Sequence, residues 1–233
     1  MNTNCKEILR QARLQLVRHY SLPMRAFIMT FCIATLIEWP FAKMQESSPY
    51  LRQTIILCIV EVLISLIGSL FICGQFRIHL NMSRNKEYSL TDLFWAFRNR
   101  PDHILICSVV LLVLNIIALI PVIGGYLLYE FAHYSIIIPI IGAIISVIAV
   151  VYLQLRYQLI YLVLLDHENI TTHDAFKISG GLMTGNLWKF FQLYLSFVGL
   201  FFLSACSFGI GLLWVYPYFL QAIVRFYLTI TGE

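Results

Sequence analysis

The chain has 233 residues, of which 60% are hydrophobic and only 12% are charged. A soluble domain carries about 25% charged residues, so this composition excludes a soluble enzyme, a disordered protein and a secreted disulfide scaffold. The net charge of +4 is no signal of nucleic-acid binding, and its distribution along the chain is more informative. The composition predicts an all-α, polytopic membrane protein.

Six stretches of the chain are long and apolar enough to cross a bilayer, which takes about 20 residues. They cover approximately 24–42, 54–74, 104–120, 136 to beyond 153, 187–206 and 212–230. None shows the period-2 alternation of a membrane β-strand. The fourth stretch is so long that it must tilt, bend near Pro139 or Gly142, or protrude from the bilayer. We therefore expect one integral membrane domain, 1–233, built as a bundle of six transmembrane helices.

Lysine and arginine gather in the cytoplasmic loops of membrane proteins. With six spans, one side of the membrane would carry Lys6, Arg10, Arg13, Arg18, Arg25, Arg77, Arg84, Lys86, Arg98, Arg100, Lys177, Lys189 and Arg225. The opposite side would carry only Lys43 and Arg52. The first twenty residues are basic and polar, so we expect no cleavable signal peptide. The bias predicts a multi-pass protein with both termini in the cytoplasm.

Two short segments begin with a similar pattern: Ser-Leu-Thr-Asp-Leu-Phe at 89–94 and Thr-Thr-His-Asp-Ala-Phe at 171–176. A serine or threonine followed three residues later by an acid is a relative of the capping box, which starts a helix. Each segment predicts a short amphipathic helix before a spanning hairpin, and residues 8–18 predict a third. We interpret the chain as three repeats of interfacial helix plus hairpin, at approximately 1–80, 81–165 and 166–233.

The last third of the chain carries a specific pattern of residues. It comprises Ala175, Ser179, Leu-Met at 182–183, Gly-Asn at 185–186, Trp-Lys at 188–189, Leu-Ser-Phe at 195–197, Gly199, 209–218, Ala222 and Phe-Tyr at 226–227. This pattern resembles a family of integral membrane proteins from Gram-positive bacteria, catalogued as a domain of unknown function. Residues 92–97 match an earlier segment of that family.

The resemblance implies the fold, the topology and a bacterial plasma membrane. The family is also distantly similar to the membrane portions of some glycerophosphodiester phosphodiesterases, whose soluble catalytic domain has no counterpart here. The resemblance therefore implies no activity and no catalytic residue.

Ionisable and amide side chains within spans are candidates for function, because their burial in lipid is costly. Glu61 lies about seven residues into the second span and is either a functional carboxylate or a structural tie. Arg156 and Arg225 could pair with it only if their helices shift outward. Gln154 and Gln158 share a face of the fourth span, where they either meet a ligand or bind a neighbouring helix.

Basic residues on the interfacial segments are candidates for binding anionic lipid headgroups. They are Arg10, Arg13, Arg18, Arg98, Arg100 and Lys189. The alternative is that these helices only cap the bundle.

The chain shows no catalytic motif. Five potential metal ligands lie within nine residues, namely Asp166, His167, Glu168, His173 and Asp174. They lack the spacing of a zinc site. A nucleophile elbow and a phosphate-binding loop are also missing. We therefore expect no catalytic residue, no metal and no cofactor.

Three functions are compatible with these observations. We expect a non-catalytic membrane protein that binds lipid or a membrane protein partner, including a second copy of itself, at its cytoplasmic helices. The alternative is a small carrier for an amphipathic or lipid-like substrate, favoured by the internal repeats. A lipid-modifying enzyme using Glu61 or the segment 166–174 is the third.

Overall fold

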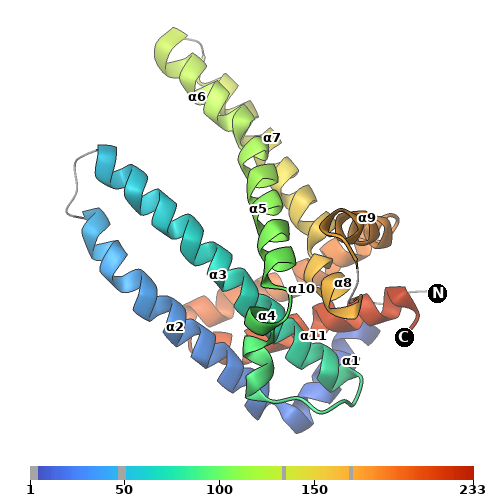
Figure 1. The fold of residues 1–233 in the computed structure, drawn as a ribbon. Helices are drawn as coiled ribbons and strands as arrows, with labels where there is room; N and C mark the ends of the chain where they lie inside the picture. The colour runs from blue at the N-terminus through green and yellow to red at the C-terminus, as the bar shows by residue number, and fades with distance from the viewer. Residues whose placement is uncertain (1–4, 47–50, 133–134, 168–169) are drawn as a thin grey trace.

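The computed structural model describes residues 5–46, 51–132, 135–167 and 170–233, and no strand occurs among them (Figure 1). The helices are α1 (Cys5–His19), α2 (Ser21–Glu46), α3 (Leu51–Ser83), η1 (Leu90–Phe94), α4 (Trp95–Arg98), α5 (Pro101–Ala118), α6 (Ile120–Ala132), α7 (Ile137–Tyr157), α8 (Ile160–Asp166), α9 (Thr172–Met183), α10 (Leu187–Cys206) and α11 (Leu212–Thr231). The all-α prediction is confirmed.

Five stretches within the described ranges are long and apolar enough to cross a membrane. They are Ser21–Phe41, Thr54–Ser83, Pro101–Phe131, Ile137–Asp166 and Leu187–Cys206, which match the first five predicted spans. The sixth predicted span forms helix α11 but is not among the five. Much of α11 is buried within the protein, including its polar residue Gln221. A sixth crossing is therefore not confirmed.

The helices form two long hairpins that diverge from a common base (Figure 1). One hairpin pairs α2 with α3, and the other pairs α5 and α6 with α7. The base, as we use the term, is the end where α1, η1, α4, α8, α9 and α11 gather. In this view α10 and α11 run across the base at an angle to both hairpins. The first and last helices, α1 and α11, pack against each other.

The long fourth span is interrupted, but neither Pro139 nor Gly142 interrupts it. Helix α7 ends at Tyr157, and α8 begins at Ile160 after a short turn. Gly142 instead allows α7 to approach α6, because a Cβ atom there would overlap the carbonyl oxygen of Pro121. Of the three ways to accommodate this length, helix α7 shows no break at Pro139 or Gly142, and the break comes near the polar end of the helix.

Both predicted helix starts are capped as expected. The carboxylate of Asp92 accepts a hydrogen bond from the backbone N–H of Ser89 at 2.9 Å. The hydroxyl oxygen of Thr171 accepts one from the N–H of Asp174 at 3.2 Å. A side-chain oxygen satisfies an otherwise unpaired N–H in each case. The three predicted repeats of interfacial helix plus hairpin stay a prediction.

Candidate functional site

A buried polar network joins α1, α3 and α11 inside the base. Gln221 is fully buried; its Nε2 donates to Gln15 Oε1 at 2.6 Å and to Ser83 Oγ at 2.7 Å. His79 Nδ1 donates to Gln221 Oε1 at 2.7 Å, and Arg225 Nε donates to Gln15 Oε1 at 2.7 Å. Each of these hydrogen bonds joins two of the three helices, so the network holds α1, α3 and α11 together.

Sequence reasoning missed this network, although a signal for it exists. His79 and Ser83 are four residues apart on α3, and Gln221 and Arg225 are four apart on α11. Polar side chains at this spacing share one helix face. A polar face on an apolar helix indicates a helix–helix contact.

A second polar cluster links α3 and α8 to the end of α11. Arg84 contacts the carboxylate of Asp166 and lies 2.8 Å from Glu233, and Tyr227 donates to Asp166 Oδ2 at 2.7 Å. The hydrogen bonds to Asp166 raise the pKa of Arg84. Asp166 therefore forms an ion pair with Arg84.

The segment that carried five potential metal ligands has other contacts in the structure. Thr171 donates to the carboxylate of Asp174 at 2.7 Å, which lowers the pKa of Asp174. Glu168 lies outside the described residues. Across the rest of the chain that the structure describes, no three metal-ligating side chains come together.

Glu61 lies in a groove between α2 and α3 with a volume of about 590 Å³. Glu38 lines the same groove, together with apolar side chains and Ser65. The two arginines considered as partners are engaged elsewhere: Arg225 with Gln15, and Arg156 with Tyr152 Oη at 2.6 Å. The pairing of Glu61 with either arginine is therefore absent. An intramembrane carboxylate that faces a cavity is a candidate for a functional role.

Replacing Glu61 with glutamine is expected to leave the fold intact. The side chain is exposed, and no ion pair joins it to another described residue. Surface substitutions of this kind change stability by about 0.5 kcal/mol or less. Thermal unfolding of wild type and Glu61→Gln in the same detergent measures the effect. A large drop in melting temperature would show that Glu61 is a structural tie.

Gln154 and Gln158 line a second cleft, of about 370 Å³, between α3, α5, α7 and α8. Other polar side chains line the cleft too, namely Ser65, Ser69, Ser108, Asn115, Tyr157 and Tyr161. Arg156 points elsewhere, as its bond to Tyr152 on the same helix shows. The predicted pair of glutamines is thus brought together with polar groups from other helices.

The predicted headgroup residues lie on separate elements of the base. Arg10 and Arg13 are exposed on α1, where Arg10 lies 2.8 Å from Glu7. Arg18 belongs to α1, but its side chain lies outside the described ones. Arg100 donates to the carbonyl oxygen of Ile170 at 3.1 Å and so ties two segments of the protein together.

The remaining two headgroup candidates also lie far apart in the chain. Arg98 is exposed at the end of α4, and Lys189 lies in the first turn of α10. Among the described candidates, Arg10 and Arg13 share one exposed face of α1.

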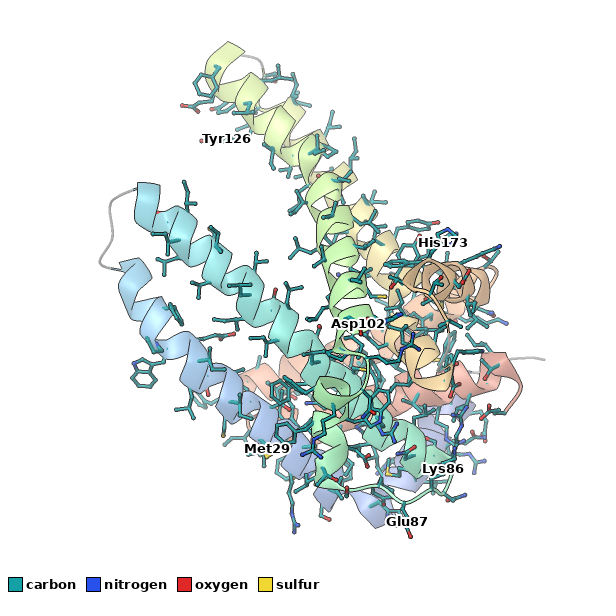
Figure 2. The ribbon with its side chains drawn as sticks, viewed as in Figure 1. Met29, Lys86, Glu87, Asp102, Tyr126 and His173 are labelled. Atoms are coloured by element: carbon teal, nitrogen blue, oxygen red, sulfur yellow. The ribbon has the colours of Figure 1, made fainter. Side chains whose placement is uncertain are left out.

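A pocket of about 580 Å³ lies beside α1, at the turn that follows α3. Its lining residues are Leu14, Gln15, His19, Met82, Asn85, Lys86 and Tyr88. Figure 2 shows Lys86 at the base of the molecule, whereas Tyr126 lies at the far end of the hairpin that α5, α6 and α7 form. Apolar side chains and a lysine thus meet in one hollow.

The chain was compared with known proteins. The family model described as "Protein of unknown function (DUF975)" matches residues 1–233, and the chain belongs to this family. No curated protein matches the chain. No solved structure matches it.

Proposed function

We propose that this member of the family is a non-catalytic integral membrane protein that binds anionic lipid headgroups at the base. The observation that carries the proposal is the pocket beside α1. Lys86 and His19 offer a cationic and a titratable nitrogen to a phosphate, while Leu14 and Met82 offer apolar contact to the adjoining acyl chain. Basic residues beside exposed apolar ones are the composition of a helix that lies in the lipid interface.

The outer face of α1 continues this surface. Its exposed residues include Arg10, Arg13, Leu14 and Val17, and the last two are 58% and 69% exposed. The opposite face, with Ile8, Ala12 and Leu16, is buried against the protein. Helix α1 therefore has one face for packing and another of mixed basic and apolar character. That division supports a lipid-facing role in addition to capping the bundle.

The proposed orientation places the base, and with it both termini, in the cytoplasm of a Gram-positive bacterium. Packing of α1 against α11 puts the first and last helices at one end of the molecule. The basic loops belong to that end, as the positive-inside rule requires. The negative surface potential of the cytoplasmic leaflet would then attract the α1 surface.

Native mass spectrometry with added phosphatidylglycerol tests the proposal. Lys86→Glu is expected to weaken phosphatidylglycerol binding about fivefold or more, because each basic residue near an anionic surface contributes about 1 kcal/mol. Lys177→Glu is the matched control, since Lys177 is an exposed lysine on α9 outside the pocket.

An equal loss of phosphatidylglycerol binding in the two variants would contradict the proposal that the pocket beside α1 is the binding site. Retention of a protein subunit without lipid would replace the proposal with the partner-binding alternative. Retention of a small amphipathic molecule instead would favour the carrier.

A further inference from the structure

The cleft between α3, α5, α7 and α8 has the features of a second binding site, distinct from the pocket beside α1. It lies on the spanning stretches, near the point where α3 and α5 pack before the two hairpins part (Figure 1). Its volume of about 370 Å³ falls within the usual range of small-molecule sites. Its lining residues all lie on stretches that are apolar enough to cross a membrane.

Polar atoms in the cleft lack partners within the protein. Asn115 Nδ2 donates to the carbonyl oxygen of Leu111 at 2.7 Å, but the buried Asn115 Oδ1 accepts no hydrogen bond from any described residue. Unpaired polar groups in the hydrocarbon region cost several kcal/mol each. Asn115 is therefore a polar residue of the lining that the described protein leaves partly unsatisfied.

Other polar groups of the cleft already bind one another. Ser108 Oγ donates to the carbonyl oxygen of Ile104 at 2.8 Å and lies 2.9 Å from Tyr161 Oη. Ser69 Oγ donates to the carbonyl oxygen of Leu66 at 2.6 Å. These bonds fix the hydroxyls. The amides of Gln154 and Gln158 add both donors and acceptors to the lining.

The lining contains no charged residue. Its polar groups are serine, tyrosine, asparagine and glutamine side chains, and its apolar ones are Leu66, Ile72, Leu111, Leu112 and Leu153. A phosphate or an ammonium would find no opposite charge here, and burying an unpaired charge is very costly. Hydroxyl groups would instead satisfy the amides without that cost. The chemistry therefore selects an uncharged head attached to an apolar tail.

We propose that this cleft binds a neutral acylglycerol, with its free hydroxyl facing the amides of Gln154 and Gln158. The leucine and isoleucine side chains contact its acyl chains. This proposal is independent of anionic headgroup binding beside α1.

The first test compares three lipids with the same acyl chains, diacylglycerol, phosphatidylcholine and phosphatidylglycerol, by native mass spectrometry of the full chain. We expect diacylglycerol to bind to the wild-type protein. Gln154→Leu is expected to weaken this binding about two- to tenfold, the change that loss of one hydrogen bond produces. Gln192→Leu is the matched control, because Gln192 is also an exposed glutamine on a spanning helix but lies outside the cleft. Equal weakening by both variants, or none by Gln154→Leu, would overturn the proposal.

The second test uses a photoreactive diacylglycerol on the wild-type protein and does not depend on any variant's folding. Crosslinks are expected in 108–115 and 153–161, which line the cleft and not the groove between α2 and α3. Crosslinks to Ile33 or Ile37 of α2 would place the lipid in the other groove and overturn the proposal. Preference for phosphatidylglycerol at the cleft would overturn it too, whereas loss of phosphatidylglycerol binding in Lys86→Glu concerns only the pocket beside α1.

Discussion

Gly74→Ala is expected to destabilise the protein by about 1–3 kcal/mol or more, the range for forcing extra atoms into a packed interior. Helix α3 passes η1 at Gly74, where the backbones of the two elements meet. A Cβ atom on Gly74 would overlap the carbonyl oxygen of Leu93 and lie 2.8 Å from the Leu93 Cα. Because the opposing atoms are backbone, no side chain can rotate away to relieve the overlap.

Gly68→Ala is the matched control for this substitution. Gly68 lies on the same helix, and apart from its chain neighbours and the nearby backbone of α3, no atom lies within 4 Å of its added Cβ. Alanine is also favoured over glycine in a helix by about 1 kcal/mol, so Gly68→Ala should be neutral or stabilising. Thermal unfolding of both variants in one detergent makes the comparison. Similar melting temperatures for the two would show that η1 does not lie against α3 as described.

Gln221→Leu is expected to cost about 3 kcal/mol or more. Leucine fills a similar volume, so the main loss is hydrogen bonding rather than packing. The amide of Gln221 binds His79, Ser83 and Gln15 at 2.6–2.7 Å. Removing it leaves His79 without its partner and the other two with fewer bonds, and a buried group without a partner costs about 1–3 kcal/mol.

Chemical or thermal unfolding of Gln221→Leu beside Gln192→Leu measures this loss. Gln192 is exposed on α10, so its replacement by leucine should change stability by about 0.5 kcal/mol or less. If Gln221→Leu proved as stable as the control, the network in the base would contribute little to holding α1, α3 and α11 together.

The helices and their starts follow from the sequence because their causes are local. Runs of about 20 apolar residues predict five of the spans, since apolar length alone matches a bilayer. The caps at Ser89 and Thr171 depend on a carboxylate or N–H only three residues away. Glutamines four residues apart also had to share one face of α7. These features could be predicted from neighbouring residues in the chain.

The sites depend on residues that lie far apart in the sequence. Asn115 meets Gln154 in a cleft only because two hairpins pack at the base. Arg225 pairs with Gln15 across 210 positions rather than with Glu61. The sequence likewise did not show that other helices bury much of α11. The sequence by itself determined the elements and their membrane character, whereas tertiary packing decided which polar groups satisfy one another and which remain available to a ligand.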